Sequence, residues 1–171
     1  METKMYVITH KMVNIPQISS YTSLFVGAAN HETDGNFDEK DNTGSNISQK
    51  NSSYCELTGL YWIWKNSNAD YVGISHYRRF FSNNAVLGAQ KYYINKKDIE
   101  EVLTKKRIIL PKPRCYEKTT LLAINYAPNR TDVKEMFRAV ETCSPDYTKD
   151  FIWYFNQNKS YLRWLLWWSY R

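Results

Sequence analysis

The chain has 171 residues, a formal net charge of +6 and an aromatic content of 16%, which suits a single domain with a sizeable core. Its basic residues are spread along the chain without a continuous stripe, which argues against a nucleic-acid-binding protein. An odd number of cysteines without metal-site spacing, no signal-peptide pattern and no apolar run of ~18 residues indicate a cytoplasmic protein without disulfides or a membrane span.

Apolar runs and helical patterns alternate along the chain and predict an α/β fold. Residues 5–9 and 23–26 are predicted strands, and the polar residues 31–45 are a predicted surface loop. A helix is then predicted to begin at Asn46 or Ser48, because either side chain can cap it. Apolar side chains fall at helical spacing on one face of this helix: Tyr54, Leu57, Leu60, Tyr61 and Trp64.

Four further elements are predicted: a strand over residues 71–75, a helix over 96–105, a strand over 108–110 and a helix over 131–143. The first of these strands is a continuous apolar run, the pattern of a central parallel strand covered on both faces. Asn95 and Asp98 have the spacing of a capping box, which begins the helix after it. Thr131 can cap the last helix.

A polar, doubly basic cluster follows the predicted strand over residues 71–75: His76, Tyr77, Arg78 and Arg79. Ligands of open α/β sheets bind beyond the carboxyl ends of the strands. Arg offers a rigid fork of donors that matches phosphate oxygens, and His adds a donor or acts as an acid or base. If strand geometry continues, His76 and Arg78 share one face of the sheet, and Tyr77 and Arg79 share the other.

This cluster predicts recognition of an anion such as a departing pyrophosphate, whose charge must be neutralised. The alternative is that the arginine pair forms salt bridges with the acidic residues of the preceding loop, Asp34, Asp38 and Asp41.

A second polar cluster lies at the start of the long predicted helix: Asn46, Ser48, Lys50, Asn51 and Tyr54. A helix amino terminus offers free N–H groups and a positive dipole end, which together favour an anion. Lys50 and Asn51 could hold a phosphate or a ribose there. The alternative is plain capping with a solvated Lys50.

Three further residues are candidates. His10 ends the first predicted strand at the ligand edge, although a lone His is more often structural. Glu56 and Asp70 are candidate bases, but Glu56 also suits a solvent-facing position, and Asp70 precedes its strand at the opposite edge. The sequence lacks the GxxxxGK[ST], GxGxxG, HExxH and GxSxG motifs, which argues against P-loop NTPases, dinucleotide oxidoreductases, zincins and α/β-hydrolases.

Several motifs are similar, in chain order, to those of a known family. They are MYVITHK near the start, VGAAN at residues 26–30, the block of residues 41–81 with YCELTGLYWIWKN and DYVGISHYRRFF, and IILPKPR at residues 108–114. On these motifs the chain resembles the family of domain of unknown function 4422, glycosyltransferase-like proteins of bacterial capsular and exopolysaccharide gene clusters. The resemblance is strongest over residues 5–114.

The resemblance implies a GT-A-like, Rossmann-related fold with a mostly parallel sheet and flanking helices. It implies transfer of a sugar from a nucleotide-sugar donor, first of all a UDP-sugar, to a polysaccharide or lipid-linked oligosaccharide acceptor. Because the metal-holding DxD motif is missing, His76, Arg78 and Arg79 are expected to stabilise the diphosphate leaving group, with no metal site assigned and a divalent metal left open. The residues expected to bind substrate are Thr9, His10, Asn46, Lys50, Asn51, Tyr54 and Tyr77.

Residues 155–171 depart from the family pattern. Family members continue beyond this point and carry a His where Asn129 or Arg130 stands in this chain, so the alternative function is a truncated, non-catalytic nucleotide-sugar-binding relative. The Trp-rich tail with Arg163 and Arg171 suits an interfacial helix in peripheral contact with the inner face of the cell membrane. The alternative for the tail is a core helix that leaves an exposed apolar patch.

Overall fold

The computed structural model describes residues 1–33, 35–82, 93–106, 108–111, 114–115, 130–157, 159–160 and 166–169. The chain forms two compact units, one of Met1–Pro111 with Arg163–Arg171 and one of Lys112–Leu162. The interpretation of residues 1–171 as one domain stays a prediction. Among the described residues, no helix is both long enough and apolar enough to cross a lipid bilayer.

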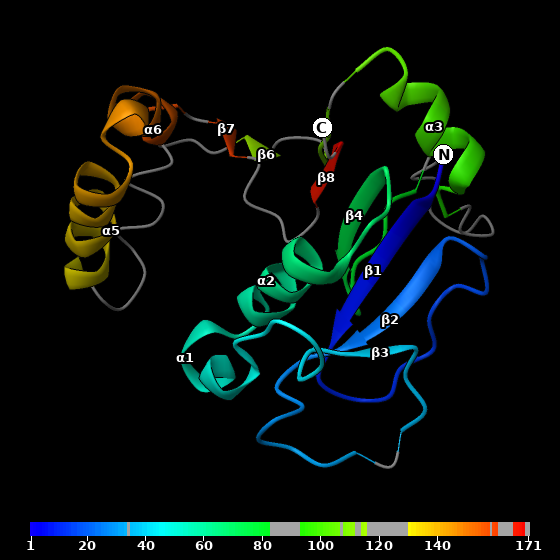
Figure 1. The fold of residues 1–171 in the computed structure, drawn as a ribbon. Helices are drawn as coiled ribbons and strands as arrows, with labels where there is room; N and C mark the ends of the chain where they lie inside the picture. Colours follow the sequence, from blue (N-terminus) through cyan, green and yellow to red (C-terminus); the bar gives the residue numbers. More distant parts are fainter. Residues whose placement is uncertain are drawn as a thin grey trace. The chain divides into compact units, whose positions relative to one another are not determined.

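The first unit is built on a six-stranded sheet with the strand order β3-β2-β1-β4-β8-β5 (Figure 1). Its strands are β1 (Thr3–Thr9), β2 (Tyr21–Phe25), β3 (Glu39–Lys40), β4 (Tyr71–His76), β5 (Ile108–Ile109) and β8 (Leu166–Ser169). β1 pairs in parallel with β2 and β4, and β3 pairs in parallel with β2, whereas β8 is antiparallel to β4 and β5. The predicted α/β fold with a mostly parallel sheet and a central strand β4 is therefore confirmed.

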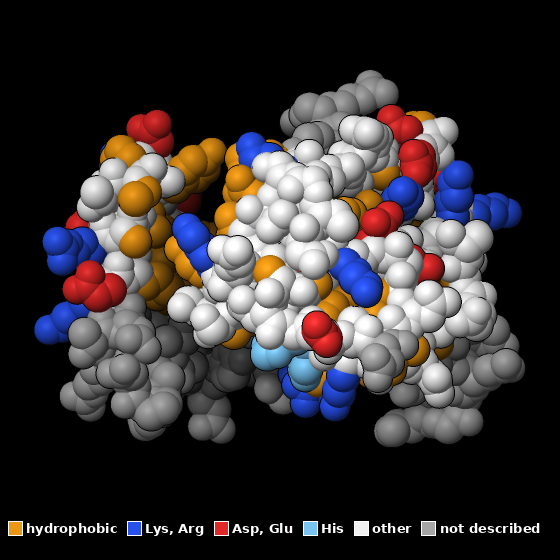
Figure 2. All heavy atoms as spheres, turned by 60° about the horizontal axis from the view of Figure 1, so that its bottom comes forward, with side chains coloured by type: hydrophobic (Ala, Val, Ile, Leu, Met, Phe, Trp, Pro, Cys, Tyr) orange, Lys and Arg blue, Asp and Glu red, His pale blue; other side chains and the backbone are white. Residues whose placement is uncertain are grey.

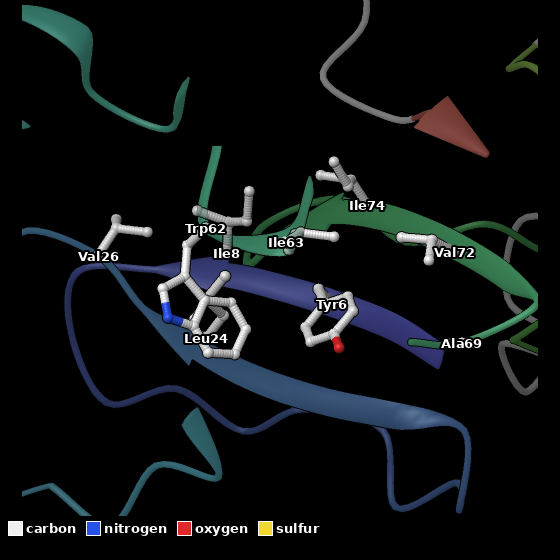
Figure 3. Close-up of a cluster of buried hydrophobic side chains, with 9 residues drawn as sticks. All are labelled: Tyr6, Ile8, Leu24, Val26, Trp62, Ile63, Ala69, Val72 and Ile74. Atoms are coloured by element: carbon white, nitrogen blue, oxygen red, sulfur yellow. The ribbon is translucent and has the colours of Figure 1, made fainter. Parts of the chain in front are cut away.

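The helix α2 (Leu57–Asn66) covers one face of the sheet. Figure 3 shows the buried cluster on this face, which consists of Tyr6, Ile8, Leu24, Val26, Trp62, Ile63, Ala69, Val72 and Ile74. Gly59 allows the helix to approach the sheet closely, because a Cβ atom on it would lie 2.8 Å from Cγ1 of Val26. The apolar face predicted for this helix is only partly turned to the core: Leu60 packs against this cluster. The side chains of Tyr54, Leu57 and Trp64 are exposed.

The long helix predicted from Asn46 or Ser48 is broken into η1 (Ser48–Lys50), α1 (Asn51–Tyr54) and α2. Cys55 lies between α1 and α2 with φ 47°, in the left-handed region that favours glycine. After this turn α2 begins, with Glu56 at its N-cap. The break explains why the buried positions of α2 do not continue the helical spacing of Tyr54.

The helix α3 (Lys96–Leu103) packs on the opposite face of the sheet. Ile99 and Leu103 are buried there with Met5 and Val7, the residues of β1 that alternate with the α2-facing ones. The predicted capping box is present, since Asn95 accepts from the backbone of Asp98 and Asp98 accepts from the backbone of Asn95. The prediction of this helix is confirmed, and β5 confirms the short strand that follows.

The tail does not form the predicted helix in its described part. Leu166–Ser169 is the strand β8, which inserts between β4 and β5 and pairs with both. Residues 161–165 and 170–171 lie outside the described residues. Both tail interpretations assumed a helix, and for residues 166–169 that assumption is wrong.

The second unit contains β6 (Arg114–Cys115), α5 (Arg130–Cys143), η2 (Pro145–Tyr147), α6 (Thr148–Phe155) and β7 (Lys159–Ser160). The predicted helix over residues 131–143 is confirmed by α5. Three aromatic rings hold α5 against α6, with centroid distances of 5.1 Å between Phe137 and Phe151 and 5.7 Å between Phe137 and Phe155. β6 and β7 pair with each other in a two-stranded sheet.

Candidate functional site

The site lies at the carboxyl ends of β1 and β4, where the strand order reverses. From β1 the chain moves outward to β2 and β3, and it returns to β4 on the other side of β1. Such a switch point leaves a crevice for ligands. A hollow of about 250 Å³ is found there, and its polar lining comes from Thr9, His10, Asn51, Glu56, His76 and Tyr77.

Tyr77 is the centre of a group of basic side chains at this edge. Nζ of Lys11 lies 5.3 Å from the centroid of the Tyr77 ring, and Cζ of Arg78 lies 5.1 Å from it. The His10 ring meets the same ring edge-on at 5.3 Å. Figure 2 shows histidine side chains at the surface beside Lys and Arg side chains. Cations gathered in this way favour an anionic ligand.

The chain turns directly after His76, because the N–H of Arg79 donates to the carbonyl of His76 at 2.8 Å. Arg78 and Arg79 are therefore both exposed on a turn at the end of β4. The predicted alternation of these side chains between the two faces of the sheet is wrong, because it required the strand to continue.

Burial favours the neutral form of His76, and both of its ring nitrogens have a polar neighbour. Its Nδ1 accepts from the backbone N–H of Arg78 at 3.2 Å, so the ring proton belongs on Nε2, which lies 3.5 Å from Oε1 of Glu56. Burial lowers the pKa of His76 below its ordinary value; Glu56 opposes this effect, while Arg78, Arg79 and His10 add to it. Nδ1 of His76 is thus taken by the backbone, and the expected contact of His76 with a phosphate stays a prediction.

The acidic loop residues do not pair with the arginines. Asp41 is completely buried and accepts from the N–H groups of Gly27 and Ala28 and from the hydroxyls of Ser48 and Thr58. Asp38 accepts from the backbone and hydroxyl of Ser23. Asp34 lies outside the described residues. Among the carboxylates that the structure describes, none forms a salt bridge with Arg78 or Arg79, so the salt-bridge alternative is wrong for Asp38 and Asp41.

The other predicted substrate-binding residues divide into two groups. Thr9 and Asn51 line the hollow, and the Asn51 amide is held by the carbonyl of Cys55 and the hydroxyl of Thr58. Asn46 donates to the carbonyls of Thr43 and Gly44, and Lys50 and Tyr54 are exposed. The structure brings Thr9, His10, Asn51, His76 and Tyr77 together and does not bring Asn46, Lys50 or Tyr54 into the hollow. The roles of all these residues in binding stay predictions.

Two residues gain importance from the structure. Lys11 was not expected at the site. It directly follows His10, so it could have been found by including one more residue after the end of the first predicted strand. Glu56 was a candidate base with no assigned place, and it contributes a carboxylate to the hollow. Asp70 accepts from the N–H of Glu2 at the amino end of β4, away from this edge.

The strand end does not fit a divalent cation. Mg²⁺ and similar ions take oxygen ligands, mainly carboxylates, whereas the side chains that follow β4 are an imidazole, a phenol and two guanidinium groups. Within the described part of the chain, no three His, Cys, Asp or Glu side chains gather as a metal site.

Comparisons with known proteins agree with the fold. The model of the family described as domain of unknown function 4422 matches residues 4–168. A solved structure described as the apo structure of the bifunctional glycosyltransferase WbbM has a TM-score of 0.81 and 27% sequence identity with this chain. The match covers 98% of this chain and 34% of that one, so the chain spans about a third of the length of WbbM. No curated protein matches the sequence.

Proposed function

The chain belongs to the family of domain of unknown function 4422, and from its likeness to a glycosyltransferase we propose that it transfers a sugar from a nucleotide-sugar donor. The donor is first of all a UDP-sugar, and the acceptor is a capsular or exopolysaccharide chain or its lipid-linked precursor. The single observation that carries this proposal is the group of cations beside the hollow at the ends of β1 and β4, none of which forms a salt bridge with a described carboxylate.

In this proposal Lys11, Arg78 and Arg79 bind the diphosphate of the donor. Charge-assisted hydrogen bonds from guanidinium and ammonium groups suit phosphate oxygens, and they gain strength as negative charge develops on the leaving diphosphate. Thr9 and His10 face the nucleobase or ribose. His76 is itself buried, and its three cationic neighbours contact the phosphates.

A nucleotide-binding experiment tests the donor site. Isothermal titration of UDP, GDP and dTDP into the protein in excess EDTA is compared with titration into Arg78→Ala and into Lys97→Ala, an exposed basic residue of α3. We expect Arg78→Ala to weaken binding by roughly 10- to 100-fold, the equivalent of one or two charge-assisted hydrogen bonds. Lys97→Ala should bind like the wild type. Binding that strictly requires a divalent metal would refute the metal-free donor site.

Donor turnover separates transfer from binding. Nucleoside diphosphate release from UDP-, GDP- and dTDP-hexoses measures hydrolysis, in which water replaces the acceptor. Binding without release would favour the alternative, a non-catalytic nucleotide-sugar-binding protein.

We further propose that the protein works in the cytoplasm at the inner face of the cell membrane, where lipid-linked acceptors are found. Flotation with liposomes that contain anionic lipids tests this location. Recovery of the protein in the floating fraction is expected, and recovery equal to that without liposomes would refute the membrane contact.

A further inference from the structure

We propose that Glu56 is the general base of the reaction, which removes the proton from the acceptor hydroxyl as that oxygen attacks the sugar. This inference rests on the proposed glycosyl transfer and assigns a catalytic group to it. Inverting transfer needs a base within hydrogen-bond reach of the attacking hydroxyl. Glu56 lies beside His76, lines the hollow and has cationic side chains nearby.

The His76 imidazole lies beside the Glu56 carboxylate. Since Nδ1 of His76 accepts from the N–H of Arg78, the ring proton belongs on Nε2, which lies 3.5 Å from Oε1 of Glu56. The imidazole is itself fixed by burial at the end of β4, with the side chain 10% exposed. One carboxylate oxygen thereby faces His76, and no hydrogen bond to the other is found within the described part of the chain. A base oriented by a second fixed group is the arrangement that general base catalysis requires.

Glu56 combines a fixed backbone with access to solvent. It occupies the N-cap position of α2, where the chain turns after Cys55, and its side chain is 31% exposed. It is the one carboxylate among the described residues that line the 250 Å³ hollow. An acceptor hydroxyl entering that hollow therefore meets one carboxylate.

The hollow also borders the cations that receive the leaving group. Tyr77 lines it, and Lys11 and Arg78 lie over or beside the Tyr77 ring. A base and an anion-binding group on the same hollow are the two parts that a single displacement needs.

The acceptor oxygen forms a bond to the anomeric carbon and gives its proton to Glu56, while the bond from that carbon to the phosphate oxygen breaks. The bonding electrons leave with the nucleoside diphosphate, whose charge Lys11, Arg78 and Arg79 neutralise. Glu56 then releases the proton to solvent, and the anomeric configuration is inverted.

The test is hydrolysis of UDP-, GDP- and dTDP-hexoses by the full chain, with water as the acceptor. Glu56→Gln keeps the size and a hydrogen-bonding oxygen but loses the basic carboxylate. Glu101→Gln, an exposed position on α3, is the matched control. We expect Glu56→Gln to lower nucleoside diphosphate release by roughly 10²- to 10⁴-fold, the usual contribution of a general base, with affinity for the nucleoside diphosphate within twofold of the wild type.

Chemical rescue separates a base from a residue that only supports the fold. Formate added to Glu56→Ala should restore part of the hydrolysis, because the small carboxylate can enter the space left by the side chain. Absence of rescue, or loss of nucleotide binding in Glu56→Gln, would assign Glu56 to structure and overturn the inference.

The failure of this inference differs from the failure of the proposed function. If the wild type hydrolyses a donor and Glu56→Gln remains within threefold of it, the base assignment alone is overturned. If the wild type hydrolyses none of the donors, the proposed function is overturned, and the base assignment with it.

Discussion

Asp41→Asn is the sharpest test of how the loop before the site is held. Asp41 is fully buried and connects the turn after β2 to η1 and α2 through four hydrogen bonds. Its Oδ2 accepts from Gly27 N at 3.0 Å and Thr58 Oγ1 at 2.7 Å, and its Oδ1 accepts from Ala28 N at 3.0 Å and Ser48 Oγ at 2.5 Å. Each carboxylate oxygen thus accepts one hydrogen bond from a backbone N–H and one from a hydroxyl.

The expected loss of stability in Asp41→Asn follows from the hydrogen bonds that each oxygen accepts. In Asn one of the two oxygens becomes an NH₂ group, and the hydroxyl on that side can turn to accept, but the backbone N–H of Gly27 or Ala28 cannot. One buried donor left without an acceptor costs about 1–3 kcal/mol, and the remaining bonds lose their charge assistance. The substitution also removes a buried charge that was costly to desolvate, and this gain offsets the lost charge assistance, so the net loss of stability should be about 1–3 kcal/mol.

The assay is urea unfolding at pH 7.5 followed by far-UV circular dichroism. Asp38→Asn is the matched control, because one oxygen of Asp38 accepts both hydrogen bonds from Ser23, and an amide oxygen can replace it. The control should lose less than about 1 kcal/mol. A difference below about 0.5 kcal/mol between the two variants would refute the reasoning, since it would show that the four buried donors find other partners.

Three further predictions concern α2 and the end of β4. Gly59→Ala should lower the free energy of unfolding by about 1 kcal/mol, because overpacking against Val26 at 2.8 Å outweighs the gain in helix propensity; an unchanged urea midpoint would contradict the close approach. Cys55→Gly should raise the stability by about 0.5–1 kcal/mol by relieving the positive φ, whereas Cys55→Ala keeps the strain and should not. In the unfolded chain His76 takes up a proton near its ordinary pKa of 6.5, whereas burial lowers this pKa in the folded chain. The free energy of unfolding should therefore fall as the pH drops below about 6.5. Urea midpoints from pH 8 to 5 check this, and a His76→Asn variant with the same slope as the wild type would exclude His76 as the cause.

The position of the site could be predicted from the sequence because it depends on strand ends. The apolar runs of β1 and β4 are local signals, and the edge at which their polar followers meet is a general property of parallel sheets. His10, His76 and Tyr77 were expected at that edge on these grounds, and they line one hollow. The course of the chain after β4 could not be predicted, because the turn there depends on one backbone hydrogen bond from Arg79 to His76.

The face of α2 could not be predicted from periodicity. Two stripes of this segment fit a helical spacing, and the larger, more aromatic stripe with Tyr54 and Trp64 was the natural choice. The buried residues of α2 are instead Thr58, Gly59, Trp62 and Ile63. At Gly59 the missing Cβ atom lets the helix lie close to Val26, and hydrophobic periodicity does not register this requirement of close packing.

The buried polar partners could not be predicted either, because they join residues that are distant in sequence. By its charge Asp41 suited an arginine partner, yet its four donors are two backbone N–H groups and two hydroxyls. These donors are uncharged, so no charge pattern in the sequence indicates them. The partners of Asp41 also affect the site. Since Asp41 is satisfied without a cation, Arg78 and Arg79 keep their charges free of any described carboxylate, and the anion-binding potential of the edge is preserved. A loop that neutralised the arginines would have removed the charge on which a metal-free diphosphate site depends.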